Sequence, residues 1–140
     1  MEIINQWKEI NFSKIVQLYE SVEWFIYAKK PMELKTAFDN SSFVLIAIED
    51  DIVIGALRSI SDDISIHFLQ DILVRPDYQR KGIAKQLLQM ALIRYAHVRT
   101  HLLLTDNDDK QHKFYQSLSY ENVKDFTKFP LNTFIKFKQN

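Results

Sequence analysis

The central segment of the chain, residues 70–85, reads QDILVRPDYQRKGIAK. Its first part continues an apolar run that begins at Ile64 and predicts a central strand, which Pro76 ends. From Gly82 onward the apolar residues recur at helical spacing as far as Tyr95, with the charged residues turned away. The segment therefore predicts a buried strand that leads through a short loop directly into a helix.

The loop between this strand and this helix has the features of an anion site. The first amides of a helix lack internal partners and lie at the positive end of its dipole, so they accept phosphate well. Gly82 and Ala84 are small enough to let an anion approach the backbone. Four cations lie within eleven residues of an otherwise neutral chain: Arg75, Arg80, Lys81 and Lys85. A pyrophosphate suits this loop, whereas the Walker pattern of NTPases and the glycine pattern of dinucleotide-binding dehydrogenases are absent.

The hydrophobic pattern outlines the other elements. The upstream elements are a helix over 12–22 with Asn11 as its cap, a short helix after Pro31, and a hairpin of strands 43–48 and 52–60 in which Gly55 marks a bulge. The downstream elements are a strand over 101–104, a helix opened by a capping box of Asp108 and Gln111, and two strands near 120–126 and 133–137 that finish the sheet.

The composition predicts one domain over residues 1–140, since 46% of the residues are apolar and no linker is visible. The 18 basic and 18 acidic residues cancel without long runs of one sign, so we expect no nucleic-acid or membrane partner. No cysteine is present, which excludes disulfides, thiolate nucleophiles and cysteine-bound zinc. Neither a signal-like start nor a long apolar run occurs, so we expect a cytoplasmic protein.

Two motifs carry a resemblance to a known family. Residues 73–76, LVRP, followed by Gln79-x-x-Gly82-x-Ala84, resemble the acetyl-CoA signature of the GNAT superfamily of N-acetyltransferases. Residues 113–120, KFYQSLSY, resemble the C-terminal motif of that family, although Ser119 replaces its usual glycine. The order of the expected elements is also that of the family, so the resemblance covers nearly the whole chain.

The resemblance implies a three-layer α/β (α+β) fold, with a mixed sheet of about six to seven strands flanked by about four helices. It also implies transfer of an acetyl group from acetyl-CoA to a primary amine by direct attack, without a metal. The residues that it implies for cofactor binding are Ile72, Leu73, Val74, Gln79, Arg80, Lys81, Gly82, Ile83, Ala84, Lys85 and, next to Asp108 at the family's asparagine position, Asn107.

Tyr115 is the implied general acid, because a phenol of pKa about 10 can protonate a departing thiolate of pKa about 8.5. Two roles stay open for Asp71, a general base or a salt bridge with Arg58. Trp24, Phe25 and Tyr27 either line the acceptor pocket or pack in the core. The alternative for Tyr115 is an ordinary aromatic that packs its helix against the sheet.

The histidines and the acidic run have simpler interpretations. His67 is a weaker catalytic candidate, and the spacing of His97 and His101 argues only slightly for zinc. Residues 106–109 lack the pattern of a calcium loop and favour a helix start.

An alternative to the enzyme is a CoA-binding sensor or interaction module that has the same fold but acetylates nothing. The sequence does not discriminate between a small-molecule amine, such as a polyamine, an aminoglycoside or an amino acid, and a peptide amine as the acceptor. Members of the family often form homodimers, and no feature of the sequence decides whether this chain does.

Overall fold

The computed structural model describes residues 1–139, and the chain divides into two compact units, Met1–Leu104 and Thr105–Asn140. The single domain expected from the composition stays a prediction. The first unit contains, in chain order, β1 (Glu2–Ile4), the 3-10 turn η1 (Trp7–Glu9), α1 (Phe12–Ser21), α2 (Phe25–Ala28), α3 (Pro31–Asp39), β2 (Phe43–Glu49), β3 (Ile52–Ser61), β4 (Ile66–Val74), the 3-10 turn η2 (Pro76–Tyr78), α4 (Ile83–Arg94) and β5 (Thr100–Leu103).

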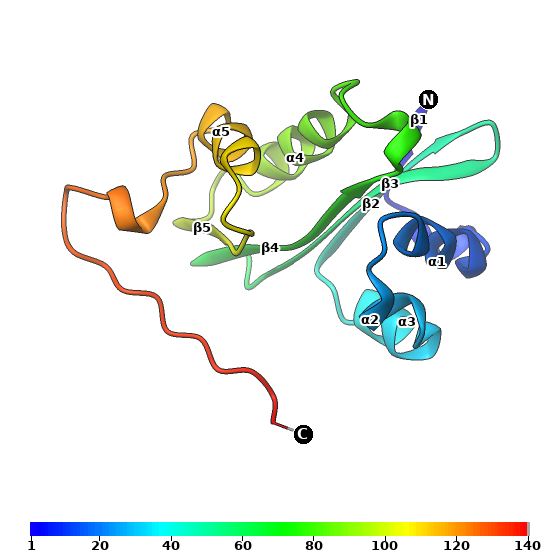
Figure 1. The fold of residues 1–140 in the computed structure, drawn as a ribbon, viewed down its shortest axis with the longest axis horizontal. Coiled ribbons are helices and arrows are strands. Elements are labelled where there is room, and N and C mark those ends of the chain that lie inside the picture. Colours follow the sequence, from blue (N-terminus) through cyan, green and yellow to red (C-terminus); the bar gives the residue numbers. More distant parts are fainter. Residues whose placement is uncertain (140) are drawn as a thin grey trace. The chain divides into compact units, whose positions relative to one another are not determined.

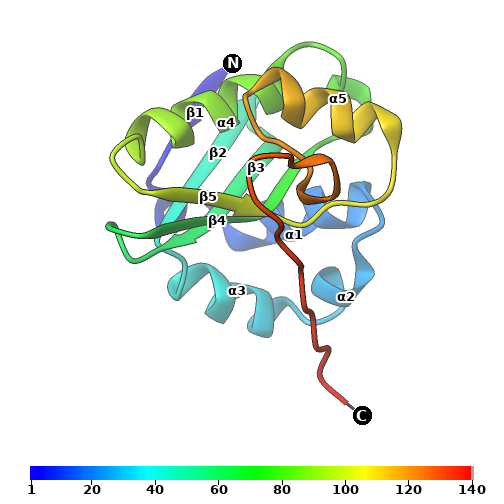
Figure 2. The ribbon, with the colours of Figure 1, turned by 90° about the vertical axis from the view of Figure 1, so that its left-hand side faces the viewer.

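The five strands form one mixed sheet in the order β1-β2-β3-β4-β5. Strands β1 to β4 run antiparallel to one another in succession, and β5 runs parallel to β4. Helices α1, α2 and α3 lie on one face of this sheet and α4 on the other, which gives three layers (Figures 1 and 2). This arrangement confirms the predicted α+β class and the mixed sheet.

The larger core lies between the sheet and α1, α2 and α3. The side chains buried there are Trp7, Ile15, Leu18, Tyr19, Ala28, Leu34, Phe38, Val44, Ile46, Val53, Ala56 and Leu73. The α1 helix forms because its apolar residues share one face and the Asn11 side chain accepts a hydrogen bond from the Ser13 amide at its start. The predicted Asn11 cap is therefore confirmed.

On the opposite face, α4 packs close to the sheet at Gly55. A Cβ atom on Gly55 would lie 3.3 Å from the Leu73 carbonyl oxygen and 3.4 Å from the Ile83 side chain. Ile83 is the first residue of α4, so the missing side chain of Gly55 allows the start of this helix to approach β3. The register shift between β2 and β3 also falls beside Gly55, as the sequence predicts.

The second unit corrects part of the prediction. It contains α5 (Asp109–Ser117) and the 3-10 turn η3 (Val123–Asp125), and no strand is present among its described residues. The strands expected near 120–126 and 133–137 are therefore wrong, and the sheet has five strands rather than six or seven. Alternating apolar residues make a strand only where a partner supplies the hydrogen bonds, and Asn122 instead caps the turn that follows it.

The helices also differ in detail from the prediction. The short α2 adds a helix to the four expected ones. At α5 the Asp108 side chain accepts a hydrogen bond from the Lys110 amide, whereas Gln111 is bonded by the Thr105 hydroxyl, so the predicted capping box is only half formed. Within residues 1–139, we find no helix with both the length and the apolar character that a membrane span requires.

A histidine pair joins β4 to β5. The Nδ1 atoms of His67 and His101 lie 3.0 Å apart, at positions that are paired in the parallel register. His67 is fully buried, and its ring stacks on Tyr95 at 4.4 Å between centroids. Burial lowers the pKa of His67 to about 4, because the charged imidazolium would lose its hydration.

We expect this pair to make the folded state sensitive to acid. Because the pKa of His67 is below its ordinary value of 6.5 in the folded state, the unfolded chain takes up the proton first as the pH falls. The stabilising contribution is complete above about pH 6.5 and should fall by about 1–2 kcal/mol between about pH 7 and about pH 5. Urea unfolding across this range should show a weaker pH dependence for His67→Phe. An equal pH dependence of unfolding in His67→Phe and in wild type would contradict the role assigned to His67. The matched control is His112→Gln, on α5.

Candidate active site

The edge of β4 that faces β5 is only partly paired. Residues Ile66–Leu69 pair with β5, whereas the pairing does not extend to Gln70–Val74. The Arg75 amide donates to the Ile54 carbonyl at 2.8 Å, so by antiparallel alternation the backbone of Leu73 faces β3. The backbone groups of Ile72 and Val74 therefore face the open side, where an extended ligand can pair with them.

The loop after β4 is held by its own side chains. Arg75 Nε donates to the Val53 carbonyl oxygen at 3.0 Å, and Gln79 Nε2 donates to the Val74 carbonyl oxygen at 3.0 Å. Arg80 and Gly82 both have left-handed backbone conformations, with φ of 64° and 81°. A Cβ atom on Gly82 would meet nothing within 4 Å, so the space in front of it is open.

The N-terminus of α4 presents amides that no side chain caps. Gly82 is the cap residue, the first helical bond runs from the Gln86 amide to its carbonyl at 3.0 Å, and the first turn contains no acidic residue. The amides of residues 83–85 precede that bond. By contrast, side chains cap the starts of α1 and α5. The start of α4 is therefore suited to an external anion.

The cations around this turn are available to a ligand. Arg80, Lys81 and Lys85 are exposed, and none of them forms an ion pair with any of residues 1–139. The Lys81 ammonium lies 5.3 Å from the centre of the Tyr78 ring. Arg75 differs from the other three, because its side chain is bound to β3.

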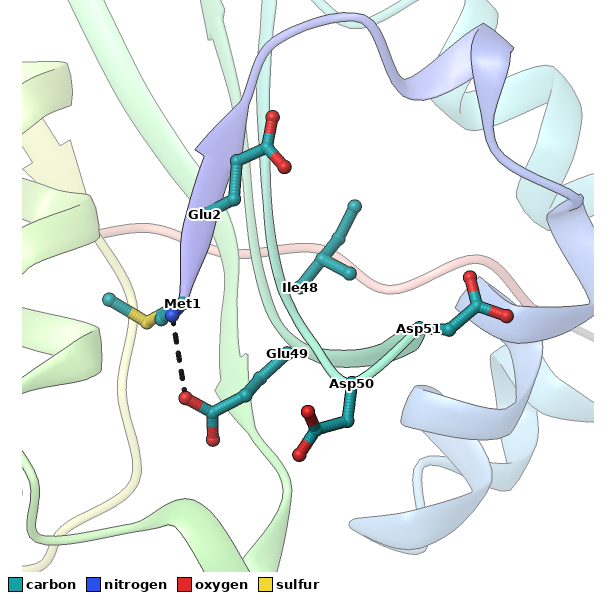
Figure 3. A pocket seen from close by; sticks show the side chains of 6 residues that line it. All are labelled: Met1, Glu2, Ile48, Glu49, Asp50 and Asp51. Atoms are coloured by element: carbon teal, nitrogen blue, oxygen red, sulfur yellow. Dashed lines mark ion pairs between the residues drawn. The ribbon is translucent and has the colours of Figure 1, made fainter.

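A hollow at the turn between β2 and β3 is lined by acidic side chains, in contrast to the cations around the start of α4 (Figure 3). Its lining residues are Met1, Glu2, Ile48, Glu49, Asp50 and Asp51. The terminal ammonium group lies 3.4 Å from Glu49, and Lys14 lies 2.8 Å from Asp51. Four carboxylates in one shallow hollow repel a polyanion, so this hollow does not compete with α4 for a pyrophosphate.

Asp71 forms a buried network on the other face of the sheet. Its side chain is 3% exposed, and its Oδ2 accepts bonds from Arg58 Nε at 2.8 Å and from the Tyr19 hydroxyl at 2.9 Å. The salt bridge with Arg58, one of the two roles left open by the sequence, is thus confirmed. Burial and the neighbouring carboxylate raise the pKa of Tyr19 well above its usual value, so Tyr19 stays a donor. A general-base role would fall to Oδ1, because both bonds end on Oδ2.

The predicted acceptor aromatics gather above this network. Trp24 is 37% exposed and Tyr27 is half-buried, and the Tyr19 ring lies 5.9 Å and 5.5 Å from their rings. Gln70 Nε2 donates to the Tyr27 hydroxyl at 3.4 Å. Neither Gln70 nor Tyr19 is predicted from the sequence as a site residue. Gln70 reaches Tyr27 from a bulge that has no local sequence pattern, and Tyr19 bonds to a residue 52 positions away.

The histidines are engaged elsewhere. His67 and His101 bond to each other, and His97 Nε2 lies 2.8 Å from Asp63 Oδ1. Over residues 1–139, no group of three or more histidine, aspartate or glutamate side chains is arranged to hold a metal ion. The predicted helix start at residues 106–109 is confirmed, since Asp108 caps α5.

Tyr115 lies on α5 in the second unit. Its ring is 5.1 Å from that of Phe114 and 5.9 Å from that of Tyr120. Burial raises the pKa of Tyr115, so the phenol retains its proton at neutral pH. The pKa of Tyr120 is raised to about 12, chiefly by burial. Asn107 is exposed just before the cap residue Asp108.

Comparison with known proteins finds similarity to acetyltransferases. Residues 40–122 match the Acetyltransferase (GNAT) domain. The uncharacterized N-acetyltransferase ycf52 of Pyropia yezoensis is 29% identical over 120 residues, which cover 81% of this chain and 66% of that protein. A GNAT family acetyltransferase from Streptococcus pneumoniae TIGR4 has a TM-score of 0.77 and 28% identity, with 94% of this chain and 97% of that chain covered.

A more distant structure shares the fold. It is an aminoglycoside acetyltransferase from an uncultured soil metagenomic sample in complex with sisomicin, with a TM-score of 0.68, 18% identity, and coverage of 98% of this chain and 96% of that chain. The chain spans 66% and 60% of the length of the first two curated relatives, so it matches about two thirds of those proteins. The matched domain contains the whole of β4, the loop and α4, and covers more than half of the chain. The chain therefore belongs to the GNAT family of acetyltransferases.

Proposed function

We propose that this protein is an acetyl-CoA-dependent N-acetyltransferase that acetylates a primary amine by direct attack. The observation that carries the proposal is the uncapped start of α4, which follows an open strand edge and is surrounded by cations that form no ion pair within residues 1–139. Membership in the family supports the acetyl donor. A small-molecule or peptide amine is the acceptor class, and the aminoglycoside complex of the distant neighbour supports including aminoglycosides in the test.

The cofactor is proposed to lie along the loop and the open edge. The amides of residues 83–85 bind the pyrophosphate, with Arg80, Lys81 and Lys85 as its counter-charges. The pantetheine arm pairs with the backbone of Ile72 and Val74, and the Leu73 backbone is left to β3. The side chain of Gln79 shapes the loop through its bond to Val74, so its part in binding is indirect. Asn107 remains a proposed contact of the pantetheine.

Besides the thioester, the reaction needs a neutral amine, a donor that stabilises the oxyanion, a proton donor and a proton acceptor. The lone pair of the neutral amine attacks the carbonyl carbon, and the Val74 amide, which faces the open edge, stabilises the oxyanion. The carbon–sulfur bond then breaks, and the Tyr115 phenol gives its proton to the thiolate. The proton of the amine leaves to water or to Asp71 Oδ1. The sequence contains no cysteine that could form an acyl-cysteine intermediate, which supports direct attack.

The first prediction concerns Gly82. Wild-type protein should bind CoA in isothermal titration, and Gly82→Val should lower the affinity at least about tenfold, because its side chain fills the open space before the helix. Gly82→Asn is the matched control for backbone strain, since asparagine tolerates a left-handed conformation. It should keep the melting temperature but lose affinity as well. Unchanged affinity in both variants would place the phosphates elsewhere, and no binding by wild type at millimolar CoA would refute the proposed function.

The second prediction concerns Tyr115. Tyr115→Phe keeps the ring but removes the proton donor, so turnover should fall about 100-fold with little change in CoA affinity. Thiol release from acetyl-CoA, followed over a panel of polyamines, aminoglycosides, amino acids and peptide amines, measures the turnover. Tyr120→Phe, which removes a neighbouring buried hydroxyl without a hydrogen-bond partner among the described residues 1–139, should retain wild-type turnover. Equal turnover by Tyr115→Phe and wild type would remove Tyr115 from the mechanism. CoA binding without thiol release in any assay would favour the sensor.

A further inference from the structure

The buried ion pair of Arg58 and Asp71 lies close to the half-buried Tyr27 ring of α2. Arg58 and Asp71 are 5% and 3% exposed, and their Nε and Oδ2 atoms are 2.8 Å apart. A pair this deeply buried seldom stabilises a fold more than well-packed apolar side chains of the same volume, because both charges lose their hydration. Positioning of neighbouring groups accounts for the pair better than stability does.

The pair lies at a bulge in β4. Arg58 pairs with Asp71, whereas Ser59 pairs with Leu69, so Gln70 is an extra residue on β4. Leu69 is also the last residue of β4 that pairs with β5. The bond between Arg58 and Asp71 therefore holds β4 at the point where its edge opens, together with the backbone that carries Gln70.

Tyr19 connects this pair to the exposed rings. Its hydroxyl donates to Asp71 Oδ2 at 2.9 Å, and its ring lies 5.5 Å from that of Tyr27. The guanidinium carbon of Arg58 lies 5.8 Å from the centre of the same Tyr27 ring. Tyr27 is thus in contact with both partners of Asp71, and its orientation depends on them.

The polar ends of Tyr27 and Gln70 remain available to a ligand. Gln70 Nε2 donates to the Tyr27 hydroxyl oxygen, which leaves the Tyr27 proton free to be donated and Gln70 Oε1 free to accept. Gln70 is exposed and Tyr27 is half-buried. The Tyr27 hydroxyl can donate to an oxygen of a ligand, and Gln70 Oε1 can accept from an N–H group of the same ligand. The two side chains therefore suit a ligand in which an N–H lies close to an oxygen.

We propose that Tyr27 and Gln70 orient the acceptor amine, and that Tyr19 and Arg58, which both bond to Asp71, are the positioning residues that hold them; this inference rests on the proposed function. The substrate class is a primary amine with a hydroxyl or carbonyl oxygen close to its nitrogen, as in amino sugars, amino alcohols and amino-acid amides. The Trp24 ring, 6.4 Å from that of Tyr27, covers the apolar part of such a substrate.

The test uses the full chain and the variant Tyr19→Phe, which keeps the ring and removes only its bond to Asp71. Steady-state kinetics with glucosamine, ethanolamine, glycinamide and n-propylamine, each corrected to its free base, should show preference for the three oxygen-bearing amines. For these, Tyr19→Phe should lower kcat/KM about tenfold, mainly through KM. Tyr27→Phe should do the same, and the double variant should lose no more than either one, because the two residues act as a unit. Tyr95→Phe, a buried tyrosine on the other face, is the control and should match wild type.

The CoA affinity separates this inference from the proposed function. Titration of Tyr19→Phe with CoA should give a dissociation constant within about twofold of wild type, since a positioning role on the acceptor side leaves the cofactor site intact. A wild-type protein that does not bind CoA would refute the proposed function itself. With CoA bound, three results would overturn the inference alone: equal kcat/KM in wild type and Tyr19→Phe, equal use of n-propylamine, or no transfer to any of the four amines.

Discussion

The unequal pairing of β4 is the constraint on which the rest of the site depends. Up to Leu69 the strand has neighbours on both sides, Gln70 is a bulge, and from Asp71 onward the strand pairs with β3 alone among residues 1–139. A backbone edge that is left open must find other partners for its amides and carbonyls. The same strand leads directly to the start of α4, whose first amides are also uncapped. Two sets of unpaired backbone donors therefore follow each other along one stretch of chain.

Three groups of charges in this neutral protein bear on the site. Exposed cations without ion-pair partners among residues 1–139 surround the start of α4, and carboxylates surround the turn between β2 and β3. The third group lies in the interior, where Arg58 and Asp71 neutralise each other. A net charge of zero thus conceals a local positive field at the start of α4, which favours an anion there.

Much of the fold could be predicted because its signals are local. The periodicities of α1 and α4, the Asn11 cap, the proline at the start of α3 and the hairpin of β2 and β3 each lie within one short stretch. The expected strands near 120–126 and 133–137 failed because a strand also needs a partner, and apolar alternation describes only one side of that pairing. The bulge at Gln70 was missed for the same reason, since it is a property of two strands.

The sequence alone was enough to indicate the family and the backbone geometry of the loop between β4 and α4. Gly82 with its positive φ, the small residue two positions later and the uncapped helix start are consequences of the local backbone, so a short motif suffices to specify them. Only the tertiary structure decided the partners of Asp71 and the meeting of Tyr27 with Gln70. Those bonds join residues 13, 52 and 43 positions apart. Such distances along the chain are closed by strand register and by the packing of helices on the sheet, which no short stretch of residues encodes.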